Sequence, residues 1–536
     1  MVAAANPLAV EAGLDVLRAG GSAIDAAIGV QAALGLVEPQ SSSIAGGAFM
    51  LHYDAKTGDV VAYDGRETAP AGATERLFLD DEGKPLPFLA AVTSGRSQGV
   101  PGVIAMLHLA WREHGKLPWA RSWQPAIKLA QDGFAVSPRL NSVTQSLKRF
   151  AAPMPDAAAY LFGPDGNPLP IGHILKNAAY GESLRRIATQ GPKGFYEGPI
   201  AEAIVARSGQ APLPGTMTLA DLKNYKPNRL EPICRPYRAR TVCGMGPPSS
   251  GGIGVMATLG ILANFDMKAS GSTTALGWHR LIEAQRLAYA DRDTYVADDR
   301  FVAVPIDGLL NADYLKTRAA LISDTGTMAK VEAGDPPGST RRGRDATGSV
   351  TGTTHFVIVD NAGNVVSMTS TVESLFGSQR MVGGFFLNNQ LTDFSFAILD
   401  AQGQPIANAP AAGKKPRSSM APTIVFNEAG QFELALGSPG GNAIIAYVAK
   451  AIVGMLDWDL SPTEAFALPN AIARTSPVAL ERSRARPELV IGLEGLGQKF
   501  RDGGGAENSG LHGIRVTPAG LVGGADPRRE GVARRP

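Results

Sequence analysis

The chain has 536 residues, 44% hydrophobic and 19% charged, so its composition is that of a folded globular protein and excludes extensive intrinsic disorder. Its formal net charge of +2 excludes the broad basic surface that captures nucleic acid, and we expect no nucleic-acid partner. The sequence has no HExxH, CxxC or GxxxxGK[ST] motif and no uncharged apolar run of about 18 residues. We therefore expect neither a zinc-protease nor a P-loop site, and no membrane span.

The N-terminal part predicts two helices and then a β-hairpin. Asn6 is a suitable N-cap for the first helix, and two glycines after residue 19 end it. Ser22, with Asp25 three residues later, opens a second helix that runs to about Leu36. Residues 48–53 and 60–63 read as two strands of a hairpin, joined by a polar turn.

The middle of the chain predicts a helix-rich layer from about residue 101 to residue 326. It contains the chain's two cysteines, Cys234 and Cys243, which either pair across a hairpin or remain free thiols. The helical patterns cover residues 103–113, 120–131, 180–189, 200–206, 253–264 and 274–290.

A polar segment then precedes a clear hairpin. Residues 326–352 are rich in Gly, Ser, Thr, Arg and Pro, so we expect a flexible, exposed segment, with the basic cluster 341–344 in a loop. Residues 354–359 and 365–370 read as two strands around the turn 360–364. Further strands are predicted at 423–427 and 431–436, and a helix at 442–455.

The junction Gly352-Thr353 carries a chemical hypothesis. A threonine hydroxyl alone is a poor nucleophile, but cleavage of the Gly352–Thr353 bond would give Thr353 a free α-amine beside its hydroxyl. The reference pKa of an α-amine, about 7.7–8.0, suits a general base at neutral pH. One residue would then supply both the nucleophile and its base.

The residues around this junction resemble the γ-glutamyltransferase (glutathione hydrolase) family. The similarity extends in order along essentially the whole chain, which makes chance agreement of the separate motifs implausible. The motifs that carry it are 64–70 (DGRETAP), 247–252 (PPSSGG), 353–356 (TTHF) with Asp360, Gly363, Asn364 and 369–371 (TST), 387–395 (LNNQLTDFS), 415–423 (KPRSSMAPT), 437–441 (GSPGG) and 525–528 (ADPR).

The resemblance implies an α+β fold, the four-layer αββα sandwich of the N-terminal-nucleophile hydrolases, with two stacked, mainly antiparallel sheets and outer helices. It implies self-cleavage between Gly352 and Thr353 into a large chain, 1–352, and a small chain, 353–536, which associate as a heterodimer. The expected partners are a γ-glutamyl donor such as glutathione and an acceptor, either water or an amino acid or peptide. No metal or organic cofactor is implied.

The resemblance also assigns roles to individual residues. Thr353 is the nucleophile, Thr371 orients it, and the backbone amides of Gly440 and Gly441 form the oxyanion hole, where each donor contributes about 2.7–4 kcal/mol to barrier lowering. The remaining matches bind the γ-glutamyl group: Arg66, Ser418 and Ser419 its α-carboxylate, and Asp393 its α-ammonium, with Gln390 and Glu373 beside Asp393.

The cellular compartment stays open. The sequence begins Met1-Val2-Ala3-Ala4 and shows no basic segment followed by an apolar one, so we expect no signal peptide within it. The family resemblance suggests a periplasmic or secreted protein.

Three rival functions remain open. Residues 95–99 (GRSQG) fit the G-x-S-x-G pattern of serine hydrolases with Ser97 as nucleophile, although 100–102 (VPG) interrupt the helix that this motif requires. Within the same fold, a glutaryl or cephalosporin acylase and a γ-polyglutamate transpeptidase would use the same threonine. The last alternative is a binding or structural protein that has lost catalysis.

Overall fold

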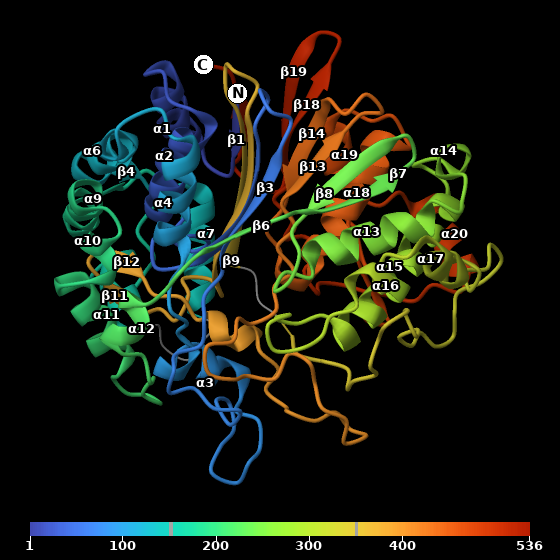
Figure 1. Cartoon of the computed structure of the whole chain (residues 1–536), viewed down its shortest axis with the longest axis horizontal. Helices are drawn as coiled ribbons and strands as arrows, with labels where there is room; N and C mark the ends of the chain where they lie inside the picture. The colour runs from blue at the N-terminus through green and yellow to red at the C-terminus, as the bar shows by residue number, and fades with distance from the viewer. Residues whose placement is uncertain (149–153, 349–351) are drawn as a thin grey trace.

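The computed structural model describes residues 1–148, 154–348 and 352–536. Two antiparallel sheets lie face to face in the centre, with one layer of helices outside each of them (Figure 1). This confirms the expected four-layer αββα sandwich. The α-helices of the described residues include none long and apolar enough to cross a membrane.

The first sheet contains the nucleophile candidate on its interior strand β9. Every neighbouring pair in it is antiparallel. It combines strands from both sides of Gly352–Thr353, so cleavage there would leave two chains sharing one hydrogen-bonded sheet. In spatial order its strands are β20 (Val532–Arg534), β1 (Val2–Ala4), β9 (Gly352–Val359), β10 (Val365–Glu373), β2 (Gly47–Tyr53), β3 (Val60–Gly65) and β6 (Asn228–Leu230).

The second sheet lies against the inner face of the first. Cys234 and Cys243 face each other on neighbouring strands and form a disulfide, which resolves the open question about the two thiols. In spatial order its strands are β19 (Gly520–Ala525), β18 (His512–Thr517), β14 (Phe432–Gly437), β13 (Thr423–Phe426), β8 (Arg240–Gly244) and β7 (Ile233–Tyr237).

The first two helices outside the first sheet begin where the sequence predicts. The Asn6 side chain accepts a hydrogen bond from the Leu8 amide, and Ser22 and Asp25 form a reciprocal capping box. This layer and the loops beneath it contain α1 (Pro7–Arg18), α2 (Ala23–Val37), α3 (Phe88–Val92), η1 (Gly95–Ser97), α4 (Val103–His114), α5 (Trp119–Ser122), α6 (Gln124–Asp132), α7 (Pro138–Leu147), α8 (Pro155–Leu161), α9 (Ala178–Gln190), α10 (Lys193–Tyr196), α11 (Pro199–Ser208) and α12 (Leu219–Lys223).

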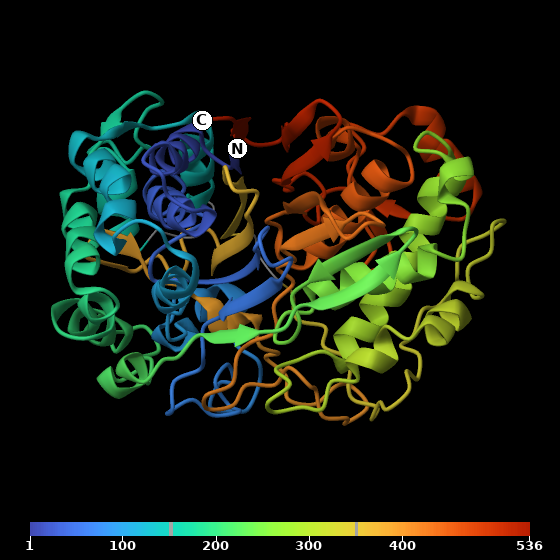
Figure 2. The same cartoon turned by 45° about the horizontal axis from the view of Figure 1, so that its top comes forward.

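The helices outside the second sheet come from both parts of the chain. The prediction of one helix-rich layer from residue 101 to residue 326 is wrong, because β6, β7 and β8 carry the chain from the first helical layer to the second (Figure 2). The second layer and its edges contain α13 (Gly251–Leu262), α14 (Met267–Ser270), α15 (Ala275–Tyr295), α16 (Ile306–Leu309), α17 (Ala312–Ala319), η3 (Gly441–Ala443), α18 (Ile444–Leu456), α19 (Pro462–Ala467) and α20 (Pro487–Gly495).

Small sheets and one short helix complete the fold. They lie among the loops at the edges of the sandwich and close its ends. These are β4 (Phe134–Ala135) with β5 (Ile174–Leu175), β11 (Met381–Val382) with β12 (Phe385–Phe386), β15 (Ala471–Ile472) with β16 (Val478–Leu480) and β17 (Phe500–Arg501), and η2 (Gln390–Asp393).

Both faces of the first sheet are buried, and alternation along β9 decides which way each side chain points. Phe356 and Ile358 pack towards α1 and α2, whereas Val357 and Val359 pack into the core between the sheets. Thr353 has the same parity as Val357. Its side chain therefore faces the second sheet, where the loops that end the inner strands converge.

The polar segment before β9 is only partly as predicted. Residues 326–348 contain no helix or strand, and many of them are exposed, but Asp345 is completely buried. The expected flexibility stays a prediction, and residues 349–351 lie outside the described part. Burial of Asp345 contradicts a uniformly exposed loop, because that carboxylate is held by partners distant in sequence.

Candidate active site

A chain of hydroxyl groups links Thr353 to the carbonyl group that precedes it. Thr371 lies opposite Thr353 in the β9–β10 register, and their Oγ1 atoms are 3.0 Å apart. Thr371 Oγ1 also donates a hydrogen bond to the Gly352 carbonyl oxygen over 3.0 Å and accepts one from the Glu373 amide. Because a hydroxyl has a single proton, Thr353 must be the donor to Thr371.

The backbone at this junction requires glycine. A Cβ atom on Gly352 would lie 2.1 Å from the Ser374 carbonyl oxygen, so no larger residue fits without movement of β10. Opposite Gly352, the strand pairing shifts register between Thr371 and Glu373. Glu373 has a φ of +77°, a left-handed conformation that costs a non-glycine residue about 1–3 kcal/mol.

Arg66 forms the centre of a group of charged and polar side chains, called the charged wall below, that comprises Arg66, Glu373, Gln390, Asp393, Ser418 and Ser419. It follows β3, and its guanidinium is completely buried. Arg66 Nη2 donates to Asp393 Oδ2 over 2.6 Å and to the Arg417 carbonyl oxygen over 3.0 Å, and Nε donates to the Pro416 carbonyl oxygen. Gln390 Nε2 donates to the same Asp393 oxygen over 2.7 Å. The expected carboxylate-binding and ammonium-binding residues are therefore in direct contact.

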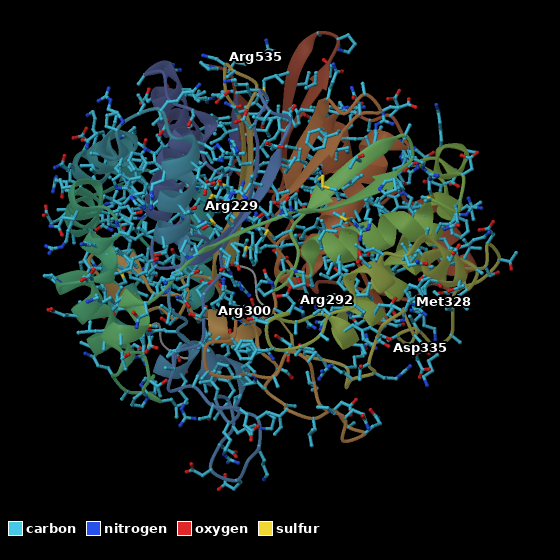
Figure 3. All side chains as sticks on the ribbon, viewed as in Figure 1. Arg229, Arg292, Arg300, Met328, Asp335 and Arg535 are labelled. Atoms are coloured by element: carbon cyan, nitrogen blue, oxygen red, sulfur yellow. A yellow bond between two sulfur atoms is a disulfide. The ribbon has the colours of Figure 1, made fainter. Side chains whose placement is uncertain are left out.

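Ser418 and Ser419 lie on the loop before β13. Both line a hollow that Thr353 and Arg66 also line. Ser419 Oγ accepts a hydrogen bond from Arg292 Nη2 over 2.5 Å and donates one to Asn442 Oδ1 over 3.2 Å. Arg292, at the inner end of α15 (Figure 3), was missed by the sequence analysis, which ended that helix at residue 290. The sequence feature that could have indicated it is the charged run 291–293 (DRD). Such a run is typical of a solvated helix end, but here it is buried.

The turn after β14 carries the two glycines expected at the oxyanion hole. Gly440 and Gly441 both have positive φ values, 141° and 56°, and a Cβ on Gly440 would lie 2.4 Å from the Tyr447 ring. The turn leads directly into η3 and α18. Gly441 and Asn442 line the hollow that Thr353 faces.

Two buried carboxyl groups have unusual proton affinity. Burial raises the pKa of Glu373 to about 8, and the nearby Asp393 carboxylate adds to this rise. Burial raises the pKa of Glu67 to about 8 as well, although Arg66 opposes the shift. At neutral pH both groups are mainly uncharged, so the wall has fewer negative charges than its composition indicates.

The hollow is small in the uncut chain. Its volume is about 30 Å³, the share of one water molecule in the liquid. It brings together the predicted nucleophile, its orienting threonine and the predicted γ-glutamyl-binding residues. The lining comprises Arg66, Arg292, Asp345, Thr347, Gly348, Thr353, Thr371, Glu373, Gln390, Asp393, Arg417, Ser418, Ser419, Met420, Gly441, Asn442 and Ile444.

Arg529 is a further residue that the sequence analysis missed. It is partly buried near the C-terminus, where Nη1 donates to the Thr353 carbonyl oxygen over 3.4 Å and Nη2 donates to the Asn508 carbonyl oxygen. The adjacent motif 525–528 gave no indication of this contact. The C-terminal tail therefore helps to position the strand that bears the nucleophile candidate.

Ser97 does not have the geometry of a serine nucleophile. It ends the short 3₁₀ helix η1, and its completely buried hydroxyl is directed to the carbonyl oxygens of Val92 and Ser94. A nucleophile elbow requires a strand before the serine and a helix after it, with the hydroxyl exposed. The serine-hydrolase alternative loses its structural basis.

The fold and the site together define a protein of the N-terminal-nucleophile hydrolase class. The sequence model of the gamma-glutamyltranspeptidase family matches residues 9–535. The chain belongs to this family.

Relatives of known name agree with this assignment. The chain is 38% identical to the glutathione hydrolase proenzyme of Escherichia coli (strain K12), over 98% of this chain and 90% of that protein. It is 37% identical to the glutathione hydrolase proenzyme of Bacillus subtilis (strain 168), over 93% and 85% of the two chains. The cephalosporin acylase of Bacillus halodurans is similar in structure, with a TM-score of 0.84, 26% identity, and coverage of 99% of this chain and 94% of that one.

Proposed function

We propose that this protein is a γ-glutamyltransferase and glutathione hydrolase that cleaves its own Gly352–Thr353 bond and then uses Thr353 as its nucleophile. The observation that carries the proposal is the hydroxyl chain from Thr353 through Thr371 to the Gly352 carbonyl oxygen. It supports the proposal because Thr371 contacts both the proposed attacking oxygen and the carbonyl oxygen of the bond that would be broken. The similarity to named glutathione hydrolase proenzymes supports the same reaction class.

Maturation proceeds by attack of Thr353 Oγ1 on the Gly352 carbonyl carbon. Thr371 donates to the developing oxyanion, and collapse breaks the C–N bond. The leaving nitrogen takes up the proton that Oγ1 loses, and Gly352 stays joined to Thr353 through an ester. Water then hydrolyses the ester. The products are a new carboxylate on Gly352 and a free α-amine on Thr353.

In turnover, the α-amine accepts the Thr353 hydroxyl proton as Oγ1 attacks the γ-carbonyl carbon of the donor. The amides of Gly440 and Gly441 stabilise the oxyanion. The α-amine passes its proton to the departing amine, which leaves Thr353 acylated by the γ-glutamyl group. Water gives glutamate and an amino acid or peptide gives a new γ-glutamyl amide, so ping-pong kinetics should follow.

The charged wall matches the two ends of the γ-glutamyl group. Arg66, Ser418 and Ser419 would bind its α-carboxylate, and Asp393, Glu373 and Gln390 would bind its α-ammonium. The Arg66–Asp393 contact of 2.6 Å supports this pairing, because a zwitterion needs a cation and an anion side by side.

The two chains would stay associated as a heterodimer after cleavage. Strand β9 pairs with β1, β10 pairs with β2, and β13 pairs with β8, so each sheet combines strands from both sides of the cut. Separating the chains would leave the backbone groups of these pairings without their partners. Co-elution of both chains in size-exclusion chromatography without denaturant tests this association.

The acylase alternative retains some support from the structural similarity to a cephalosporin acylase. A glutaryl group carries a carboxylate but no amine, so Asp393 and Glu373 would lose the α-ammonium group that we propose they bind. Comparison of γ-glutamyl-p-nitroanilide with glutaryl-p-nitroanilide separates the two functions. We expect preference for the first, and preference for the second would refute the proposed function.

A further inference from the structure

A short stretch of the polar segment forms a wall between two hollows. Side chains alternate along it: Asp345 and Thr347 line the small hollow that contains Thr353, whereas Arg344 and Ala346 line an outer hollow of about 440 Å³. The segment reaches the wall from the outer surface, where Met328 and Asp335 lie (Figure 3). Residues 344–348 lie shortly before the proposed cleavage bond. In this section they are called the wall, and they are distinct from the charged wall around Arg66.

Two arginines hold the wall in place. Arg417 Nη2 donates to Asp345 Oδ2 over 2.8 Å, and Asn408 Nδ2 donates to the same oxygen over 2.9 Å. Arg474 Nη1 donates to the Thr347 carbonyl oxygen over 2.9 Å and Nη2 to the Asp345 carbonyl oxygen over 3.2 Å. Asp345 thus occupies a site that binds a carboxylate.

The charges around this site depend on the wall. Arg292, Arg417 and Arg474 all have a nitrogen within 4 Å of a carboxylate oxygen of Asp293. Asp345 supplies a second negative charge to this group through its ion pair with Arg417. Without it, the three guanidinium groups, of which those of Arg292 and Arg417 are buried, would share the Asp293 carboxylate, and buried cations lacking an anion are strongly unfavourable.

The wall must move before a donor can bind. A γ-glutamyl group is several times larger than the water-sized hollow that the wall leaves. Cleavage after Gly352 would turn the wall into part of a chain end, anchored from one side only. Its departure would join the inner and outer hollows and remove Asp345 from Arg417.

We infer that Arg417 and Arg474 form a second carboxylate-binding subsite in the cleaved enzyme, which takes a free carboxylate on the leaving-group side of the donor. This inference rests on the proposed function. Arg66 already serves the α-carboxylate of the γ-glutamyl group, so the second subsite suits a leaving peptide or an acceptor that ends in a carboxylate. Guanidinium groups bind such a group with paired, charge-assisted hydrogen bonds.

Two chromogenic donors that differ by one carboxylate test the subsite. They are γ-glutamyl-3-carboxy-4-nitroanilide and γ-glutamyl-4-nitroanilide, and cleavage of each is measured as kcat/KM per cleaved molecule, counted by mass spectrometry. In Arg474→Met we expect a roughly 10- to 100-fold loss with the carboxylated donor and less than a threefold loss with the other, because hydrogen bonds to charged groups contribute about 1.5–3 kcal/mol. The matched control is Arg344→Met, on the outer face of the same wall, which should change neither value.

A double variant guards against a folding defect. Asp345→Asn combined with Arg417→Met removes the cation together with the anion it pairs with in the uncut chain. It should show the same selective loss. Equal losses with both donors in both variants would overturn the subsite but leave the proposed function intact. If the wild-type protein cleaves neither donor, the proposed function fails and the subsite fails with it.

Discussion

The nucleophile hairpin and the charged wall of the site are built in different ways. Thr353 and Thr371 lie on neighbouring strands of one hairpin, and the backbone ladder places them opposite each other. Arg66, Asp393 and Ser419 come from three separate loops and are placed by side-chain contacts across long sequence separations. Strand register therefore fixes the positions of the hairpin side chains, and charge pairing fixes those of the charged wall.

This difference separates two kinds of sensitivity. A substitution on the hairpin leaves the backbone geometry in place and removes a reacting atom, so it should change chemistry without changing the fold. A substitution in the charged wall leaves a buried partner without its counter-charge, so it should affect both binding and stability. The predictions below test the two regions separately.

The largest effect is expected from Thr353→Ala. The variant lacks the attacking oxygen for both cleavage and turnover, so we expect a folded, uncut and inactive chain. Denaturing gel electrophoresis and a γ-glutamyl-p-nitroanilide assay measure the two outcomes. The control Thr353→Ser keeps a hydroxyl and should still be cut. A cut or active alanine variant would contradict the role of Thr353.

Thr371→Val should slow cleavage by about 10²–10³-fold. It preserves the shape of the strand but removes the hydroxyl that donates to the Gly352 carbonyl oxygen, and one such donor contributes about 2.7–4 kcal/mol. A time course of the uncut band after rapid purification gives the rate. Thr371→Ser is the matched control and should be cut at close to the wild-type rate, whereas unchanged cleavage in the valine variant would exclude the hydroxyl chain.

Asp393→Asn should lower kcat/KM for γ-glutamyl-p-nitroanilide by roughly 10- to 100-fold. The substitution keeps the shape but removes the charge expected to bind the α-ammonium, a hydrogen bond of about 1.5–3 kcal/mol. Cleavage at Gly352 should continue, because Asp393 does not contact the hairpin hydroxyls. Asp81→Asn, at an exposed turn, is the control and should behave as wild type. Equal activity of the Asp393 variant would remove this residue from the ammonium site.

The hairpin was the more predictable of the two regions. The apolar runs at 354–359 and 365–370, on either side of a turn, predict the two strands. The register then follows from their pairing. Asn6, Ser22 and Asp25 likewise marked the helix starts correctly, because caps are local signals. The residues Arg66, Asp393 and Ser419 were found only through the family resemblance.

Other parts could not be inferred because their causes are distant in sequence. Asp345 looked like a loop residue, since nothing near it indicates that Arg417 and Asn408 will bury it. The strands β7 and β8 were missed because they are short and only partly buried, with a proline in β7. Arg292 was read as lying beyond a helix that in fact continues to residue 295.

The smallest effect is expected from pH. The pKa of Glu373 is about 8 in the folded chain, so this carboxyl is uncharged below pH 8 and becomes an anion above it. An anion favours the donor's α-ammonium, so KM should fall about three- to tenfold from pH 7 to pH 9. Glu373→Gln should lack this dependence and show only the titration of the donor itself. Parallel pH profiles for the two proteins would exclude Glu373 from the ammonium site.

The most direct test is the mass of the purified wild-type protein together with the N-terminal sequence of its fragments. We expect two polypeptides that remain associated, one ending at Gly352 and the other beginning with the free amine of Thr353. Retention of the Gly352–Thr353 bond in a preparation that still consumes γ-glutamyl donors would contradict the use of Thr353 as both nucleophile and base.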